Sequence, residues 1–184
     1  MKVMSGSARG TVLHVPRSDL RPTMDVVKGA IFSSLQEIVP GARILDLFAG
    51  TGSLGIEALS RGATDVVFVE NDRRACDTIR KNLEKTRLKG DVQNCDVFSY
   101  LDRLALPRSF DIILADPPYA KYPGERDFDP ELLTNAGLLN SLKPDGIFVL
   151  EHLPSKDLPT YPEWDCFRDK RYGATAVAFL RPVH

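Results

Sequence analysis

A short acidic turn, DPPY at Asp116 to Tyr119, contains residue types that could do chemistry. It follows the apolar run FDIILA at 110–115, so it is expected to end a buried strand. Such a turn can hold a carboxylate, a backbone carbonyl and a flat aromatic ring in fixed positions, because Pro117 and Pro118 restrict the backbone. Taken alone, these four residues are more often an ordinary turn, so their meaning depends on the rest of the chain.

A glycine-rich segment, DLFAGTGSLGIEAL at 46–59, supplies the second signal. Its glycines have G-x-G-x-x-G spacing between a strand-like run and a helical pattern, the context in which a nucleotide-type ligand lies against a helix N-terminus. A β–α turn without a ligand is the simpler alternative. The loop residues expected to contact a ligand are Phe48, Ala49, Gly50, Thr51 and Gly52.

The charges near this loop indicate which ligand it binds. A dinucleotide would present a pyrophosphate, which a carboxylate at Asp46 would repel. S-adenosylmethionine instead presents a sulfonium and an ammonium group, which suit an acid near a strand end. Glu70, at the end of the next strand-like run, is placed to accept hydrogen bonds from ribose hydroxyls, a role that both ligands allow. Asp96 could face the adenine amino group with Val97 beside the ring, although an acid before a helix is at least as often an N-cap.

With a methyl donor bound, the DPPY turn predicts transfer to an amino group on a nucleobase. Such a nitrogen is a poor nucleophile because its lone pair is delocalised into the ring. If the Asp116 carboxylate and the Pro117 carbonyl accept its two N–H bonds, the nitrogen becomes pyramidal and its lone pair can attack. The Asp116 charge would stabilise the positive charge that develops on nitrogen, and Tyr119 would stack on the base. This chemistry requires no metal.

The elements that must position these residues read as an α/β fold. From Arg43 onward, short apolar runs alternate with helical patterns, which is typical of a parallel sheet with helices on both faces. The runs are RILDLF, DVVFVE, DVQNCD, FDIILAD and GIFVLE. Two further runs, WDCFRDKRYG and ATAVAFLRP, have no helix between them and predict an antiparallel hairpin at the end of the sheet.

Residues 1–40 have a different pattern and are expected to form an N-terminal extension of a single domain, 1–184, whose catalytic sheet occupies 41–184. KVMSGSARGTVLHVP predicts two short strands around a glycine-rich turn. TMDVVKGAIFSSLQEIV predicts an amphipathic helix with Thr23 as its N-cap. The apolar face of this helix would contain Val27, Ile31, Leu35 and Ile38.

Composition gives no global sign of a polyanion or membrane partner. The 184 residues include 24 Lys plus Arg and 25 Asp plus Glu, for a net charge of −1. No apolar run has the length of a secretory or membrane-spanning segment, so we expect a cytoplasmic protein. We also expect a monomer. Cys76, Cys95 and Cys166 lack metal-type spacing and are expected to be reduced, mostly buried thiols.

Six stretches together resemble one known family. GSARG, LRPTMDVVKGAIFSSL, DLFAGTGSLGIEALSRGA, VVFVEND, DPPY and KRYGATAVAFLR are similar to segments of the RsmD family of bacterial methyltransferases, which modify the N2 amino group of one guanine in 16S ribosomal RNA. The similarity runs through almost the whole chain. It implies a seven-stranded S-adenosylmethionine-dependent fold and a substrate in the assembled small ribosomal subunit. By position, Gly50 to Gly52 and Glu70 would hold the cofactor, and Asp116 to Tyr119 would take the guanine.

A local excess of positive charge near the N-terminus predicts the RNA contacts. Arg9 lies in a glycine-flanked turn and Arg21 lies before a proline. Both positions are expected to be exposed and to suit contacts with RNA phosphates. For Arg21, bracing the docked helix is nearly as good an explanation.

Three other functions stay open at this point. An amino-methyltransferase that acts on adenine N6 in DNA or RNA would use the same acidic turn. A non-catalytic RNA-binding module would keep only the fold. A dinucleotide-dependent oxidoreductase would share the glycine loop but leave DPPY without a purpose.

Overall fold

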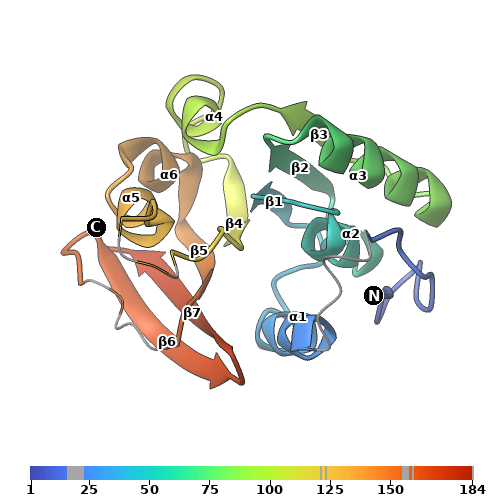
Figure 1. The fold of residues 1–184 in the computed structure, drawn as a ribbon, viewed down its shortest axis with the longest axis horizontal. Helices are drawn as coiled ribbons and strands as arrows, with labels where there is room; N and C mark the ends of the chain where they lie inside the picture. The colour runs from blue at the N-terminus through green and yellow to red at the C-terminus, as the bar shows by residue number, and fades with distance from the viewer. Residues whose placement is uncertain (16–22, 121, 123, 155–157, 159, 184) are drawn as a thin grey trace.

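The computed structural model describes residues 1–15, 23–120, 122, 124–154, 158 and 160–183. Within these residues lies a seven-stranded sheet of order β3-β2-β1-β4-β5-β7-β6 (Figure 1). The strands are β1 (Arg43–Leu47), β2 (Asp65–Glu70), β3 (Asp91–Asn94), β4 (Phe110–Ala115), β5 (Leu142–His152), β6 (Trp164–Tyr172) and β7 (Thr175–Pro182). Neighbours among β1 to β5 pair in parallel, whereas β7 pairs antiparallel with β5 and β6. The predicted α/β sheet and its antiparallel C-terminal hairpin are confirmed.

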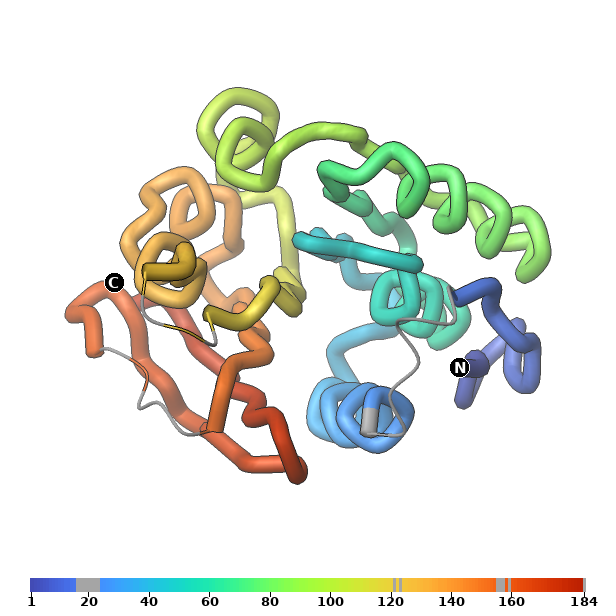
Figure 2. Tube along the Cα trace, viewed as in Figure 1, coloured from blue at the N-terminus to red at the C-terminus, as the bar shows by residue number. Residues whose placement is uncertain are grey.

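Helices cover both faces of the sheet (Figures 1 and 2). One face carries α1 (Thr23–Ser34), α2 (Ser53–Ser60) and α3 (Arg73–Thr86), and the other carries α4 (Val97–Arg103), α5 (Phe128–Leu133) and α6 (Ala136–Ser141). Side chains alternate along a strand, so Ile44 of β1 packs in the core with α1 to α3 while Leu45 packs with α4 to α6. Both are fully buried, which explains why these strands are almost continuously apolar.

The N-terminal segment forms the predicted antiparallel pairing over only a few residues. Residues 1–3 and 11–13 pair antiparallel around a bridge between Lys2 and Val12, with backbone hydrogen bonds from Val3 to Thr11 and from Leu13 to Met1 at 2.9 and 3.1 Å. The buried Glu57 carboxylate of α2 accepts hydrogen bonds from the Met4 and Ser5 amides at 2.8 and 3.1 Å. A helix side chain thus satisfies the backbone donors of Met4 and Ser5, where the pairing ends, so the predicted hairpin is present but short.

The first helix is shorter than predicted. It ends at Ser34, and the chain then turns, so Ile38 leaves the apolar face and is 43% exposed. Val39 is buried in its place, and Pro40 directly after it disfavours a helical backbone there. The side chain of Thr23, the predicted N-cap, lies outside the described part of the structure. The remaining predicted face is buried as expected: Val27, Ile31 and Leu35.

The cysteines are less uniform than expected. Cys76 is buried and Cys95 is half-buried, but Cys166 is exposed. It lies on the edge strand β6, where the side chains from Asp165 to Arg171 all face solvent. The prediction of mostly buried thiols was therefore wrong for Cys166.

Candidate active site

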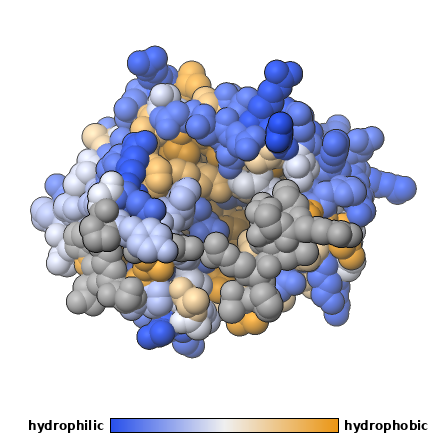
Figure 3. All heavy atoms as spheres, viewed as in Figure 1, coloured by the Kyte–Doolittle hydropathy of each residue, from blue (hydrophilic) through white to orange (hydrophobic). Residues whose placement is uncertain are grey.

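A cleft of about 990 Å³ opens at the edge where the parallel strands end. Open α/β sheets bind their ligands at this edge. Figure 3 shows apolar surface near the middle of the face viewed in Figure 1, framed by hydrophilic side chains. The cleft brings together predicted site residues from four strand ends: Phe48 and Gly50 after β1, Glu70 at the end of β2, Asp96 and Val97 after β3, and Asp116 to Tyr119 after β4.

A narrower recess of about 140 Å³ adjoins this cleft. Asp116 and Glu151 line both spaces, so the recess and the cleft meet beside these two acids. The recess also contains the predicted residues Asp46, Phe48, Ala49, Gly50 and Thr51.

Gly52 is the one predicted loop residue that lines neither space. It is buried, with φ of 77°, a backbone conformation that favours glycine. A Cβ atom at this position would lie 3.1 Å from the Ile79 side chain. Gly52 therefore shapes the turn into α2, and its predicted role as a direct ligand contact is not supported by its position.

The glycine loop is held in place by Glu70. One carboxylate oxygen accepts a hydrogen bond from the Gly50 amide and the other from the Asp72 amide, each at 2.8 Å. Glu70 is half-buried and lines the cleft. Since an ionised carboxylate has about four acceptor positions, Glu70 can hold the loop and still accept hydrogen bonds from a ligand hydroxyl.

Asp46 is a buried acid at the floor of the recess, only 1% exposed. Its carboxylate accepts a hydrogen bond from the Gly55 amide at 2.9 Å. Glycine is required for this approach, because a Cβ on residue 55 would lie 2.3 Å from the Phe68 ring. Burial, with a smaller effect from the Glu70 charge, raises the pKa of Asp46 to about 8 despite that hydrogen bond. A cationic ligand group in the recess would favour the ionised form.

Asp96 caps a helix and faces the cleft at the same time. Its side chain accepts a hydrogen bond from the Ser99 amide at 2.9 Å, at the start of α4. The alternative role as an N-cap is therefore present in the structure. Asp96 nevertheless lines the cleft beside the buried Val97, so the two residues remain available to a flat ring.

The DPPY turn lines the cleft, and its first residue, Asp116, also lines the recess. Asp116 is half-buried, Pro117 is buried and Pro118 is exposed. The Tyr119 hydroxyl donates to Glu151 at 3.0 Å and also bonds to Thr175. Burial and the nearby Glu151 charge raise the pKa of Tyr119 far above its ordinary value, so the ring stays neutral.

Sequence reasoning missed Glu151 and Thr175. The Thr175 hydroxyl also lies 3.0 Å from a Glu151 carboxylate oxygen, so the hydroxyls of Thr175 and Tyr119 form one cluster with Glu151, in which each hydroxyl proton serves one contact at a time. The available signal was that Glu151 ends the strand-like run GIFVLE, as Glu70 ends DVVFVE.

An aromatic cluster forms another part of the cleft wall and was also missed. The Arg126 guanidinium lies 4.9 and 4.7 Å from the ring centroids of Phe98 and Phe128. Phe128 meets Phe48 edge to face at 5.1 Å. Arg126 is also paired with Glu131 at 2.7 Å, so its position over the rings is fixed from two directions.

The predicted RNA contacts lie away from this cleft or outside the described residues. Arg9 is exposed in the expected glycine-flanked turn. That turn bonds to Ser60, the last residue of α2, whereas the first residue of α2, Ser53, lines the recess. Arg9 is therefore near the end of α2 that points away from the site. Arg21 lies outside the described residues.

Two further observations concern metals and membranes. Among the residues that the structure describes, no group of three or more His, Cys, Asp or Glu side chains could hold a metal ion. In the same part of the chain, no helix has the length and apolar character needed to cross a membrane.

His152 is buried and bonds to Asp169 at 3.1 Å, a structural contact rather than one within the cleft.

Curated relatives cover nearly the whole chain. The protein YlbH of Bacillus subtilis (strain 168) is 38% identical over 98% of both chains. The Ribosomal RNA small subunit methyltransferase D of Haemophilus influenzae is 34% identical and covers 94% of this chain and 89% of its own. The enzyme of that name from Escherichia coli (strain K12) is also 34% identical, with coverage of 96% and 87%.

Solved structures agree with these relatives. The protein yhhF of Escherichia coli matches with a TM-score of 0.83 and 31% identity, covering 99% of this chain and 97% of its own. A hypothetical protein of Thermus thermophilus matches with a TM-score of 0.80 and 30% identity over 100% and 99% of the two chains. The family described as Conserved hypothetical protein 95 matches residues 1–181. The chain therefore belongs to this family, the RsmD family of methyltransferases.

Proposed function

We propose that this protein uses S-adenosylmethionine to methylate the exocyclic N2 amino group of a guanine in 16S ribosomal RNA. The observation that carries the proposal is the position of Asp116, which lines both the recess beside the glycine loop and the wide cleft. A group in the recess and a base in the cleft would meet beside this carboxylate. We also propose that the chain forms a single methyltransferase domain and acts as a monomer.

The residues of the recess and loop fit such a cofactor. The acids Asp46, Asp116 and Glu151 face the recess, and acidic side chains suit the cationic end of S-adenosylmethionine. Glu70 would hold the ribose hydroxyls, and Asp96 with Val97 would face the adenine. When bound, S-adenosylmethionine supplies a methyl group on a positively charged sulfur.

The acidic turn would prepare the target nitrogen. The Asp116 carboxylate and the Pro117 carbonyl would accept hydrogen bonds from its two N–H groups, which favours a pyramidal nitrogen whose lone pair is less delocalised into the ring and can attack the methyl group. The Asp116 charge would stabilise the cation that forms as the nitrogen gains its fourth bond, and would be a nearby acceptor for the proton that must then leave. Tyr119, with its hydroxyl tied to Glu151 and Thr175, would present a fixed ring for the base to stack on.

The choice of ribosomal RNA as substrate is supported by the names of the relatives, which are small subunit ribosomal RNA methyltransferases. The acidic turn itself would accept the amine of adenine as readily as that of guanine. The net charge of −1 argues against strong binding to naked RNA, where neutralised phosphates dominate affinity. We therefore propose the assembled small subunit as the substrate.

The test is methylation of small subunits purified from cells that lack the gene, with radiolabelled S-adenosylmethionine, followed by mapping of the labelled nucleotide. We expect one labelled guanine with wild-type protein and greatly reduced label with Asp116→Ala. Naked 16S RNA should be labelled less than the subunit. Label on adenine would favour the N6 alternative. An absence of label, together with binding of NAD and not of S-adenosylmethionine in calorimetry, would contradict the proposal.

A further inference from the structure

The recess beside the glycine loop contains a buried cation that the proposed reaction does not use. Lys28, on α1, is 2% exposed and lines the recess together with Asp46, Asp116 and Glu151. Among the described residues around this space, Lys28 has the only cationic side chain. An ammonium group buried so deeply is unfavourable unless it is paired, so its position calls for a physical reason.

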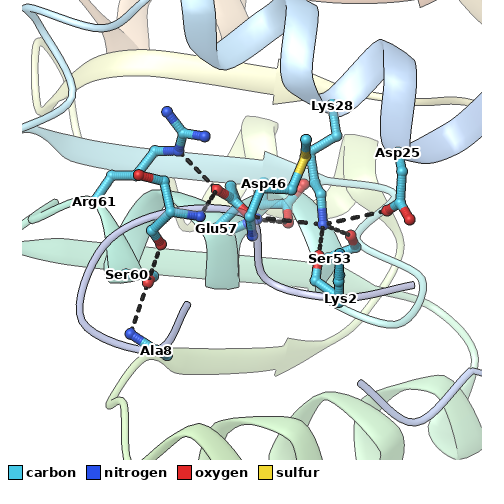
Figure 4. A network of polar contacts seen from close by, with 12 residues as sticks. Lys2, Ala8, Asp25, Lys28, Asp46, Ser53, Glu57, Ser60 and Arg61 are labelled. Carbon is cyan, nitrogen blue, oxygen red and sulfur yellow. Dashed lines mark hydrogen bonds and ion pairs between the residues drawn. The ribbon is translucent and has the colours of Figure 1, made fainter. Parts of the chain in front are cut away.

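Figure 4 shows how the ammonium group is held. Nζ donates to the Lys2 carbonyl at 2.7 Å and to the Ser53 hydroxyl at 3.3 Å. The carboxylates of Glu57 and Asp25 lie farther away, at 3.6 and 3.8 Å. These contacts fix Nζ beside the first residue of α2, where the glycine loop ends.

A purely structural role would be to neutralise the buried Glu57, but that carboxylate has closer partners. Arg61 pairs with it at 2.7 Å, and the Met4 and Ser5 amides donate to it at 2.8 and 3.1 Å. Burial lowers the pKa of Lys28, and the charges of Glu57 and Asp25 only partly oppose that effect. Neutralisation of Glu57 therefore does not account for Lys28, whose other side is the recess.

The ligand proposed for the recess supplies a matching group. The amino-acid end of S-adenosylmethionine carries an ammonium and a carboxylate on one carbon atom. Acids in the recess suit the ammonium and the sulfonium, but those that are ionised would repel the carboxylate of the ligand. We propose that Lys28 is the residue that binds this carboxylate, an inference that rests on the proposed function and adds a binding residue to it.

The test compares two ligands that differ only in this group: S-adenosylmethionine and its decarboxylated form. Calorimetry should show that wild-type protein prefers the carboxylated compound by about 10- to 100-fold, the range of a charge-assisted hydrogen bond. Lys28→Met should lose most of this preference by binding S-adenosylmethionine more weakly. Its affinity for the decarboxylated compound should change by less than about threefold, since that compound has no group for Lys28 to bind.

A matched control is Lys143→Met, which removes a lysine that pairs with Asp111 at 2.7 Å and lines neither the recess nor the cleft. It should keep the wild-type preference. Thermal melting checks the fold of each variant, and Lys28→Gln, which keeps an N–H donor for the Lys2 carbonyl, replaces the Met variant if that variant does not fold.

The outcomes separate the two proposals. Wild-type protein that binds neither compound overturns the proposed function and this inference together. Wild-type protein that binds both equally well overturns the role of Lys28 alone, without any variant. Full preference in a folded Lys28→Met protein has the same meaning.

Discussion

The two halves of the candidate site are held in place by different groups. In the glycine-loop half, Glu70 and Asp46 accept hydrogen bonds from backbone amides of the loop and helix. In the DPPY half, the Tyr119 hydroxyl bonds to the side chains of Glu151 and Thr175. Removing a carboxylate that accepts from a backbone amide leaves that amide without its partner. Removing a carboxylate or hydroxyl that bonds only to other side chains leaves the backbone hydrogen bonds unchanged. Changes in the first half should therefore alter folding and affinity, and changes in the second should alter the rate.

The largest effect is expected at Asp116. Asp116→Ala should lower the rate by about 100- to 1,000-fold, the usual loss when one preorganised electrostatic partner is removed. Its stability should stay close to wild type, and its affinity for S-adenosylmethionine should fall far less than its rate, because the contribution of this carboxylate belongs mainly to the transition state. Single-turnover methylation of small subunits is the measurement. Asp116→Asn, which keeps an acceptor oxygen, should retain more activity than the Ala variant, and near wild-type turnover by Asp116→Ala would mean that DPPY is only a turn.

The second largest effect is expected at Glu70, in the glycine-loop half of the site. Glu70→Ala should weaken S-adenosylmethionine binding by about 1 to 3 kcal/mol, and it should lower the melting temperature because the Gly50 amide loses its acceptor. Calorimetry and thermal unfolding measure the two effects. Asp77→Ala, which breaks an exposed ion pair with Arg80 on α3, is the control and should change neither. A Glu70→Ala protein with normal stability and affinity would remove the distinction between the halves.

The third effect is on stability and depends on pH. With its pKa raised to about 8 from an ordinary 3.8, Asp46 keeps its proton in the folded chain at pH values where the unfolded chain has lost it. The folded state then binds more protons, so the contribution of Asp46 to stability falls as pH rises across this window and levels off above it. Asp46→Asn should remove this dependence. Urea unfolding at about pH 5 and about pH 8 should show that the free energy of unfolding of the variant, relative to wild type, is higher at pH 8 than at pH 5. The same difference at both pH values would contradict the raised pKa of Asp46.

The smallest effect is expected at the hydroxyl of Tyr119. Tyr119→Phe keeps the ring but loses its anchor, a hydrogen-bond contribution of about 0.5 to 1.5 kcal/mol, so the rate should fall by only about 2- to 10-fold. Adding Thr175→Val should change little more, since both residues belong to one set of hydrogen bonds. Turnover and S-adenosylmethionine affinity are measured together. A large loss of affinity would show that this half also supports the cofactor.

Local patterns made much of the site predictable. The glycine loop and the DPPY turn are short, and each follows a strand that is buried on both sides, so sequence spacing alone puts them at one edge of the sheet. The antiparallel hairpin was equally predictable, because no helical pattern separates its two strands.

What could not be predicted depends on contacts between distant segments. Thr175 reaches Tyr119 and Glu151 only because β7 returns antiparallel to β5. Lys28 reaches Ser53 because α1 packs over the start of α2 in three dimensions, and no periodicity in either segment encodes that contact. The short length of the N-terminal hairpin has the same cause, since the acceptor for its Met4 and Ser5 amides is Glu57, more than fifty residues away.

The strand order also matters while the chain is being made. β7 lies between β5 and β6, so within the described sheet β6 bonds only to β7, although β6 precedes it in the chain. During synthesis, residues 164–172 must wait without a partner strand until residues 175–182 exist, and unpaired strands invite association with other chains. The exposed stretch from Asp165 to Arg171 is rich in charges of both signs, which oppose such pairing. We therefore expect the charges that cover the edge of the finished sheet also to disfavour aggregation while β6 is still unpaired.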